Sequence, residues 1–322
     1  MTNRFNFQLS IIMKTLSVIV PCYNEDAVIV DTYNRLKKVL SELKNTCGSI
    51  IFINDGSKDG TRDILSGIAA KDSAVKVIHF SRNFGHQKAV TAGIHYCQSD
   101  FAVIIDADLQ DPPELIPELL AKQEEENANV VYCVRNNRIG EGKFKLWSAK
   151  TFYRSLNKLS EVQFPLDTGD FRLIDACVMR EFNRFKEKGK YVRGIISWIG
   201  FKQVPFYYER EARKAGETKY PLKKMLGFAS VALLYFSKKP LIMAISLGFL
   251  AVLLGIIMAL WYIFGKIFGY TAAESGWTSI MITIIFFGGI QLLTVGVLGQ
   301  YIGILFDEVK ERPEYIIEEI MN

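Results

Sequence analysis

An apolar run in the segment FAVIIDADLQDPPE, residues 101–114, leads directly into three aspartates. Carboxylates gathered at a strand end repel one another, so they usually face a cation or a positively charged partner. Asp106, Asp108 and Gln110 alternate, and in an extended segment their side chains project to one side. Oxygen ligands of this kind suit Mg²⁺ or Mn²⁺ and leave coordination positions for phosphate oxygens. We therefore predict that these three residues hold Mg²⁺ or Mn²⁺ under a diphosphate.

A helix start is the simpler use for one of these acids. Asp111 stands ahead of Pro112 and Pro113, and proline is typical of the first helical turn. Asp111 is expected to cap that helix, which leaves the other two carboxylates to the cation.

Two further loops carry polar groups that suit a nucleotide. The carboxylate of Asp55, in NDGSKDGT, could accept a hydrogen bond from a pyrimidine N–H, while Gly56 and Gly60 would let the backbone turn closely around the base. A local Asx-turn at Asp55 is nearly as good an interpretation. In SRNFGHQKA, His86 and Lys88 could face the diphosphate. A lone histidine in a loop is more often a surface residue, and 3 histidines in the chain argue against a histidine-based metal site.

An acidic turn and a basic cluster follow. FPLDTGDFRL places Asp167 and Asp170 around a glycine, and Arg213, Thr218 and Lys219 come later in YYEREARKAGETKYPLKK. Guanidinium and ammonium donors suit a phosphate monoester, whereas a plain basic patch at a membrane surface is the alternative. An anionic lipid headgroup satisfies both interpretations.

Short apolar runs alternate with helix-like stretches, which predicts βαβ units and a parallel, Rossmann-like sheet with helices on both faces. Ligands of such sheets bind beyond the carboxyl ends of the strands, where PCYNE, NDGSKDGT, SRNFGHQKA and DADLQDPPE all fall. The expected strands are Leu16–Val20, Ser49–Ile53, Val75–Phe80, Phe101–Ile105 and Asn129–Val134. The expected helices are Ala27–Leu43, Thr61–Ala70, Gln87–Cys97 and Pro112–Glu125.

Two segments near the C-terminal end, 241–264 and 278–306, are almost free of charge. Each exceeds the roughly 20 apolar residues that cross a bilayer, and neither has the polar face of a soluble core helix. Lysines cluster before the first span, whereas the connecting loop offers only Lys266, so the positive-inside rule places residues 1 to about 240 and both termini in the cytoplasm of a multi-pass inner-membrane protein. Tyr220–Phe236 is predicted to be an interfacial helix.

The bulk composition agrees with this division. Mean hydropathy is +0.14, and the apolar excess lies in the two spans. The net charge of +5 is modest and gathers near the membrane, which favours anionic lipid over nucleic acid as the partner. The 5 cysteines are scattered without metal-type spacing and predict reduced thiols. No signal peptide is evident.

The predicted domains are a cytoplasmic α/β domain at 1–212, a juxtamembrane segment at 213–240, two transmembrane helices within 241–306 and a cytoplasmic tail at 307–322. Small residues along the second span suit close helix packing. They are consistent with a homo-oligomer, a dimer or tetramer, and equally with packing against the first span. These residues are Gly288, Gly289, Gly296, Gly299 and Gly303.

Taken in order, SVIVPCYNE, NDGSKDGT, DADLQDPPE, LDTGDFRL and RKAGETKY, followed by two spans, resemble glycosyltransferase family two. More narrowly they resemble polyisoprenyl-phosphate glycosyltransferases, namely bactoprenol glucosyltransferases of the GtrB type, with dolichyl-phosphate mannose synthases as more distant relatives. The resemblance covers essentially the whole chain. It implies an α/β GT-A catalytic domain with an all-α membrane domain, and inverting, metal-dependent transfer of glucose from UDP-glucose to undecaprenyl phosphate at the cytoplasmic face.

The resemblance also implies roles for individual residues. Asp167 would be the catalytic carboxylate, and Thr218 stands where the family commonly has serine. The residues expected to bind the nucleotide sugar are Pro21, Tyr23, Asn24, Glu25, Asp55, Ser57, Lys88, Asp106 and Ala107. The residues expected at the lipid phosphate are Arg135, Arg138, Arg213, Thr218 and Lys219.

Two other functions remain open from the sequence. A processive polysaccharide synthase shares this catalytic half but carries a QxxRW segment and more spans, and the chain has neither. A non-catalytic membrane scaffold or lipid carrier would keep the fold without activity, but intact Asp106, Asp108 and Asp167 argue against it.

Overall fold

The computed structural model describes residues 13–135, 168–209, 239–268 and 276–322. The chain divides into two compact units, each described by itself below. The larger comprises residues 1–154, 162–221 and 313–322, and the smaller comprises residues 155–161 and 222–312.

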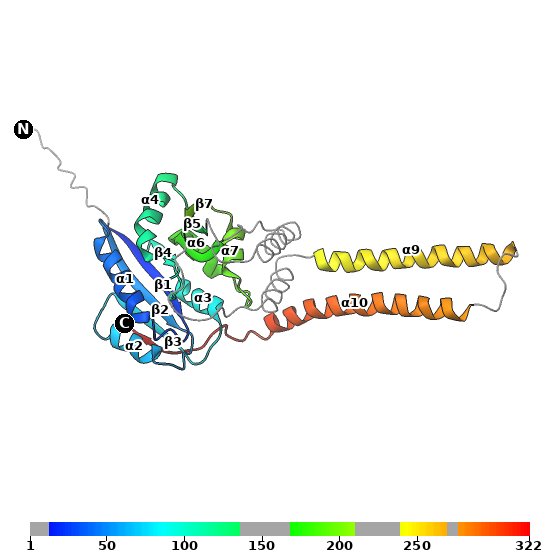
Figure 1. Cartoon of the computed structure of the whole chain (residues 1–322), viewed down its shortest axis with the longest axis horizontal. Coiled ribbons are helices and arrows are strands. Elements are labelled where there is room, and N and C mark those ends of the chain that lie inside the picture. Colours follow the sequence, from blue (N-terminus) through cyan, green and yellow to red (C-terminus); the bar gives the residue numbers. More distant parts are fainter. Residues whose placement is uncertain (1–12, 136–167, 210–238, 269–275) are drawn as a thin grey trace, which may run out of the picture. The chain divides into compact units, whose positions relative to one another are not determined.

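An 8-stranded mixed sheet forms the centre of the larger unit, in the order β7-β5-β6-β4-β1-β2-β3-β8 (Figure 1). Strands β1 to β4 are mutually parallel, β6 is antiparallel to β4 and β5, and β8 is antiparallel to β3. The strands are β1 (Lys14–Cys22), β2 (Thr46–Asn54), β3 (Val75–Phe80), β4 (Phe101–Ile104), β5 (Val130–Arg135), β6 (Thr168–Asp175), β7 (Gln203–Tyr208) and β8 (Ile317–Met321).

The five strands predicted from the sequence are confirmed as β1 to β5. The expectation of a parallel sheet holds only for its centre, because two strands run against their neighbours. Strands β6, β7 and β8 were not predicted. The β8 sequence IEEIM is short and two of its 5 residues are acidic, so it lacks the apolar run by which β1 to β5 are recognised.

Helices cover both faces of the sheet, as predicted. Side chains alternate along β1, so Leu16, Val18 and Val20 join the core under α1, α2 and α4, whereas Ile19 points to α3 on the other face. The helices on the first face are α1 (Ile29–Glu42), α2 (Thr61–Ala69), the 3₁₀ turn η1 (Pro113–Leu115) and α4 (Ile116–Glu126). Those on the second face are α3 (His86–Tyr96), α6 (Ala176–Arg184) and α7 (Val192–Ile199).

Gly93 lets α3 lie close to the sheet. A Cβ there would come within 2.2 Å of the Ile19 Cγ2 atom, so Gly93→Ala must displace the buried Ile19 side chain or move the helix away from the strand. We expect a loss of about 1–3 kcal/mol in the free energy of unfolding, measured by denaturant unfolding of the purified chain. Gly67→Ala in α2 is the matched control, because a Cβ there meets nothing within 4 Å. The control should be neutral or slightly stabilising, and equal losses in both variants would contradict this account.

The predicted helix cap at Asp111 is wrong. The 3₁₀ turn begins at Pro113, and the residue at its N-cap is Pro112, with φ −73° and ψ 121°. The Asp111 carboxylate is fully buried and accepts a hydrogen bond from the Tyr208 hydroxyl at 2.5 Å. Asp111, two residues before the 3₁₀ turn, therefore contacts Tyr208 of β7 instead of capping the helix.

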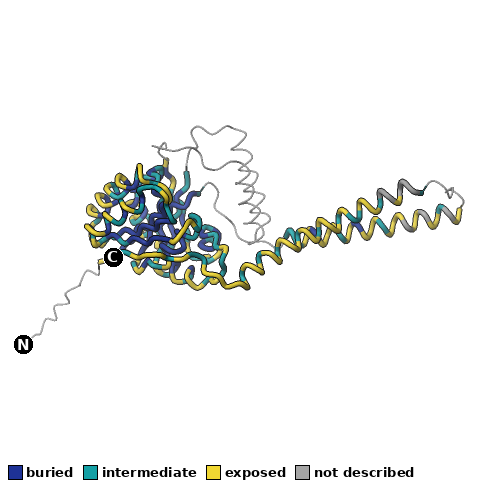
Figure 2. The backbone as a smooth tube through the Cα atoms, turned by 90° about the horizontal axis from the view of Figure 1, so that it is seen from below, coloured by how far each residue is buried: buried dark blue, intermediate teal, exposed yellow. Residues whose placement is uncertain are grey.

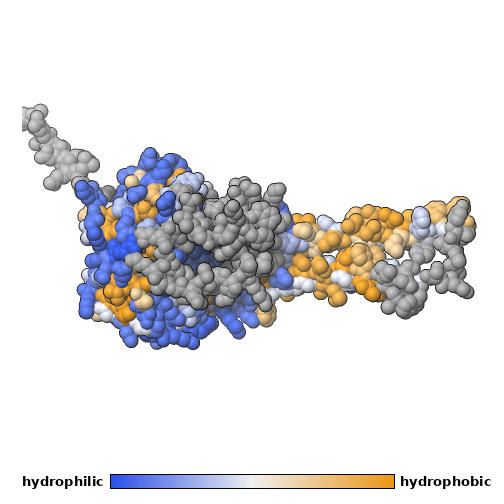
Figure 3. All heavy atoms as spheres, in the orientation of Figure 1, coloured by the Kyte–Doolittle hydropathy of each residue, from blue (hydrophilic) through white to orange (hydrophobic). Residues whose placement is uncertain are grey.

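Two long apolar helices make up the described part of the smaller unit: α9 (Lys239–Ile267) and α10 (Trp277–Val309). Their apolar segments, Lys239–Gly265 and Thr283–Val309, have mean hydropathies of 2.8 and 1.6, and 11% and 0% of their most apolar windows are buried. Figures 2 and 3 show this exposed, apolar surface. Both helices are long and apolar enough to cross a membrane, and neither is buried as a soluble core helix would be. The predicted interfacial helix at Tyr220–Phe236 lies outside the described residues.

The small residues of α10 do not pack tightly on α9 within the described residues. A Cβ added at Gly288, Gly296 or Gly303 would meet nothing within 4 Å. The close approach between the two helices is instead at Gly255, where a Cβ would lie 3.4 Å from the Phe287 ring. Packing inside one chain therefore does not explain these glycines, and self-association stays a prediction.

The C-terminal residues differ most from the sequence interpretation. Residues 307–322 were expected to form a cytoplasmic tail with no predicted strand, but α10 continues to Val309 and β8 completes the sheet of the larger unit. The chain therefore returns to the sheet after its second apolar helix.

Candidate active site

The strand directions gather acidic and polar residues at one edge of the sheet. The parallel strands β1 to β4 all end there, and Asp106 comes just after β4. Strand β6 runs the other way, with Ile104 opposite Arg172 in the pairing register. The first residues of β6, Thr168 to Asp170, therefore lie at the same edge as Asp106.

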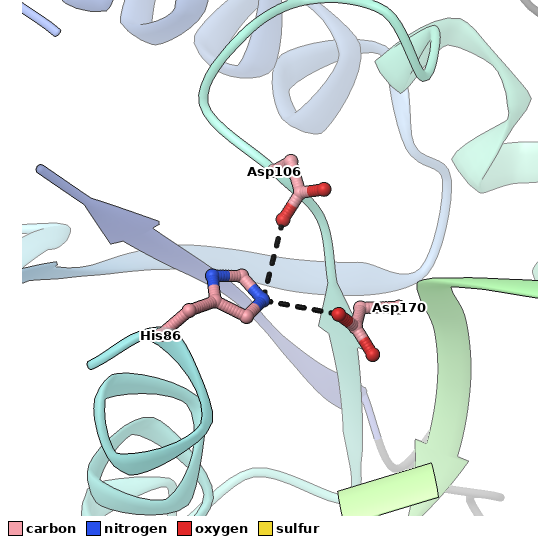
Figure 4. A group of neighbouring side chains, drawn as sticks. All are labelled: His86, Asp106 and Asp170. Carbon is pink, nitrogen blue, oxygen red and sulfur yellow. Dashed lines mark hydrogen bonds and ion pairs between the residues drawn. The ribbon is translucent and has the colours of Figure 1, made fainter. Parts of the chain in front are cut away.

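His86, Asp106 and Asp170 converge at this edge (Figure 4). The His86 Nε2 atom lies 3.0 Å from Asp170 Oδ2 and 3.6 Å from Asp106 Oδ1. One nitrogen or oxygen from each residue lies within 4.8 Å of the others, close enough to share a metal ion. His86 starts α3, so three segments distant in sequence contribute to one cluster.

The charges of the cluster shift the pKa values of its members. Burial disfavours the protonated form of His86, but its hydrogen bond to Asp170 and the nearby carboxylates outweigh burial and raise its pKa to about 9. Burial, aided by the charge of Asp170, raises the pKa of Asp106 to about 6. Burial also opposes ionisation of Asp170, yet Arg193 and His86 dominate and hold its pKa well below the usual range.

Asp170 is fixed from the α7 side. The Arg193 Nε–H donates to Asp170 Oδ1 at 2.8 Å, and the Arg193 Nη1 donates to the carbonyl oxygen of Thr168 at 2.9 Å. Gln87 of α3 is hydrogen-bonded to the same helix, because its Oε1 accepts from the Val192 N–H at 3.0 Å. Helix α7 thus holds both Asp170 and the start of α3.

The loop after β4 is not extended, so the alternation expected for Asp106, Asp108 and Gln110 is wrong. The strand ends at Ile104, and Leu109 adopts φ +56°, a left-handed conformation that is rare for an apolar residue. The Gln110 N–H donates to Asp108 Oδ1 at 3.1 Å. Asp106 belongs to the cluster with His86, and the metal roles of Asp108 and Gln110 stay predictions. Backbone strain of this kind is common at functional sites.

The predicted nucleotide residues after β1 and β2 interlock. The Asn24 N–H donates to Ser57 Oγ at 3.0 Å, and Asn24 Oδ1 accepts from the Lys58 N–H at 2.8 Å. The Glu25 N–H donates to Thr61 Oγ1 at 2.9 Å. These bonds tie the PCYNE loop to the NDGSKDGT loop and bring the predicted residues together at one edge.

Asp55 has a role in this structure that the sequence did not show. Its side chain is buried, and its two oxygens accept hydrogen bonds from the N–H groups of Phe84 at 2.6 Å and Gly85 at 2.9 Å. A carboxylate oxygen has a second lone pair, so a contact to a base is still open to it. Gly56 adopts φ +63° against the backbone of Arg82, which confirms its need for glycine. Gly60 has φ −69°, so no special conformation requires glycine there.

Arg135, predicted at the lipid phosphate, ends β5 at the same edge. Its Nε–H donates to the Tyr208 hydroxyl at 3.3 Å, and its Nη2 lies 3.6 Å from Asp111 Oδ2. Gly169 makes room for it, since a Cβ there would lie 2.5 Å from that Nη2.

The remaining predicted residues fall into two groups. Pro21 lies within β1, Lys88 lies in the first turn of α3, and the carbonyl oxygen of Ala107 accepts from Thr32 Oγ1 at 2.8 Å. Tyr23 is 36% exposed beside them. Outside the described residues lie Asp167, Arg138, Arg213, Thr218 and Lys219.

Sequence reasoning did not find how the cluster is assembled. His86 was considered for the diphosphate but not for a metal cluster, Asp170 received no role, and Arg193, which holds Asp170, carried no signal. A glycine followed by His86 at a helix start and an acidic residue in a Thr-Gly-Asp turn were visible, but nothing local joined them.

The mixed sheet and the acidic edge define a GT-A type of glycosyltransferase fold. The family described as glycosyl transferase family 2 matches residues 17–186, and the chain belongs to this family. It is therefore a glycosyltransferase, and the predicted resemblance is confirmed.

Relatives match over nearly the full chain. A Bacillus subtilis protein named uncharacterized glycosyltransferase YkcC is 48% identical over 94% of this chain and 93% of its own. An Escherichia coli protein named prophage bactoprenol glucosyl transferase homolog is 36% identical over 95% of this chain and 99% of its own. Among solved structures, glucosyl-3-phosphoglycerate synthase from Mycobacterium tuberculosis aligns with a TM-score of 0.46 and 20% identity, covering 69% of this chain and 78% of its own.

Proposed function

We propose that the enzyme transfers glucose from UDP-glucose to a polyisoprenyl phosphate, with inversion, at the cytoplasmic face of a membrane. The observation that carries this proposal is the 36% identity to bactoprenol glucosyl transferases over 94% of the chain and 97% of the relative from Shigella phage SfII. Similarity of that extent includes the two apolar helices as well as the catalytic sheet.

The cluster at the sheet edge fits a divalent cation. Asp106 and Asp170 offer oxygens and His86 offers a nitrogen, all within 4.8 Å of one another. Mg²⁺ prefers oxygen ligands, whereas Mn²⁺ also accepts imidazole, so coordination by His86, which would have to release its proton to the solvent on metal binding, favours Mn²⁺. When bound, the cation would neutralise charge on the departing diphosphate. Asp108 and Gln110 stay candidates to complete an all-oxygen set.

The transfer itself requires little acid–base chemistry. A phosphate oxygen of the lipid attacks the anomeric carbon as the carbon–oxygen bond to UDP breaks, and UDP leaves with the bonding electrons. A phosphate monoester with a second pKa near 6 is largely ionised at neutral pH, so no strong base is needed. The protein must hold the two reactants in line.

The apolar helices support a membrane-bound acceptor. Their exposed apolar surface would lie in lipid, and after α10 the chain returns to β8 of the catalytic unit. Lysines before the first helix favour the cytoplasm for the catalytic unit by the positive-inside rule. A site near the headgroups confines the search for the acceptor to two dimensions.

Asp167 immediately precedes Thr168 of β6 and is proposed to orient the acceptor or the sugar. We expect Asp167→Asn to lower turnover about 10²-fold while UDP binding, measured by calorimetric titration, is unchanged. A variant with normal turnover would remove Asp167 from the reaction.

The function is tested with purified full-length protein in lipid. UDP- and GDP-sugars are each offered with undecaprenyl phosphate and Mg²⁺ or Mn²⁺, and the lipid product is identified by mass spectrometry. We expect a single hexosyl lipid from UDP-glucose that chelation of the metal abolishes. Sugar transfer only to water or to a soluble acceptor would refute the proposal.

A further inference from the structure

Residues 313–322 form an integral part of the larger unit, beside the site. Strand β8 pairs with β3, and the Ser81 N–H donates to the carbonyl oxygen of Ile316 at 3.0 Å. Arg62 contacts Glu318 at 2.8 Å, and the side-chain amide of Asn322 donates to the carbonyl oxygen of Val75 at 3.2 Å. These contacts fasten the segment along its whole length.

The first part of this segment supports the loop that carries His86. The Tyr315 ring stacks on Phe80, with centroids 5.0 Å apart and an interplanar angle of 10°. Phe80 in turn meets the edge of Phe84 at 5.7 Å. The Phe84 N–H is one of the two donors to Asp55, and His86 follows two residues later. Tyr315 therefore packs behind the turn that aims His86 at the cluster.

Glu314 supports the opposite wall. Its Oε1 lies 2.6 Å from Lys190 Nζ, and the two side chains are only 15% and 10% exposed. Lys190 stands just before α7, the helix whose Arg193 holds Asp170. Breaking a buried ion pair from one side leaves an uncompensated charge, so such a pair restrains its two segments strongly.

We propose that Glu314 and Tyr315 are positioning residues, which join the β3–α3 loop to the start of α7 and so fix His86 relative to Asp170. Neither residue belongs to the cluster itself. Because they follow α10 directly, the chain that leaves the second apolar helix is also the chain that braces the site. The turnover readout rests on the proposed function, whereas the exchange readout below does not.

Tyr315→Leu, made in the full-length protein, tests the aromatic contacts of Tyr315 with Phe80 and of Phe80 with Phe84. We expect faster hydrogen exchange at the Phe84 and Gly85 amides, and a kcat about tenfold lower with little change in donor KM. Tyr315→Phe keeps the ring and should match the wild type. Asn322→Ala loosens the far end of the same segment and should lower the unfolding midpoint without either effect.

The proposal fails if Tyr315→Leu leaves hydrogen exchange at Phe84 and Gly85 unchanged. It also fails if Asn322→Ala, at a loss of stability equal to that of Tyr315→Leu, speeds exchange and lowers kcat to the same extent. A wild type that makes no lipid-linked sugar would refute the proposed function alone, since exchange still reports the brace.

Exchanging the charges tests the ionic arm. Glu314→Lys or Lys190→Glu alone should speed hydrogen exchange at the Val192 amide, whose N–H donates to Gln87 Oε1. The double variant should restore the slow exchange of the wild type. Glu314→Gln, which keeps the shape, provides a milder version if a reversal does not fold. Unchanged exchange in Glu314→Gln, or no recovery in a folded double variant, would overturn the role of Glu314.

Discussion

We expect Asp106→Asn to lower sugar transfer on the order of 10³-fold at saturating donor and metal. The substitution keeps the shape of the side chain and removes the charge that the proposed metal site would offer to a cation and its diphosphate. Asp106 lies among other carboxylates, and burial with their repulsion raises its pKa to about 6. Neutralising it removes repulsion, so we expect the unfolding midpoint to be kept or raised while activity is lost.

Initial rates across a Mg²⁺ and Mn²⁺ titration measure this effect, with the unfolding midpoint recorded for the same preparations. Asp63→Asn is the matched control, because Asp63 is an exposed carboxylate in the first turn of α2, and it should behave as the wild type. A rate within about tenfold of the wild type in Asp106→Asn would be incompatible with a metal-diphosphate site at this residue.

Asp170→Asn is the second large change, with transfer expected to fall on the order of 10²-fold. The carboxylate accepts hydrogen bonds from His86 at 3.0 Å and from Arg193 at 2.8 Å. An asparagine amide has no negative charge and only one oxygen, so it cannot replace both charge-assisted hydrogen bonds. Unlike Asp106, Asp170 has a pKa that its partners lower, so its charge is favourable in the fold. Its removal should cost about 3 kcal/mol of unfolding free energy.

A double-mutant cycle with Arg193→Gln isolates the shared contact. If Arg193 acts through Asp170, the two substitutions together should cost little more in activity than either alone. Independent, additive losses would show that Arg193 contacts a substrate or another group directly. The opposite stability effects of Asp106→Asn and Asp170→Asn separate a carboxylate whose charge is unfavourable in the fold from one whose ion pairs also hold the site together.

Local patterns were sufficient for much of the fold. The apolar runs of β1 to β5 and the helices between them follow from period and length, and the two apolar helices follow from composition alone. The prediction of an extended segment after β4 was wrong because the alternation of acidic residues gives no sign of a turn with Leu109 in the left-handed region.

The site was predicted where one segment carries it and missed where several do. Asp106 was expected at a strand end, and the PCYNE and NDGSKDGT loops do meet, as the direction of parallel strands requires. The basic cluster at the lipid phosphate stays a prediction, since four of its five members lie outside the described residues.

By itself, the sequence determined the class of enzyme, the parallel core with acids at its carboxyl edge, and the two apolar helices, because burial period, turn chemistry and hydropathy are local properties. Only the tertiary structure decided that His86 meets Asp170, 84 residues away, and that the C-terminal strand closes the sheet beside β3. Such pairings depend on which distant segments become neighbours when the sheet forms, and the local sequence of a segment does not specify those neighbours.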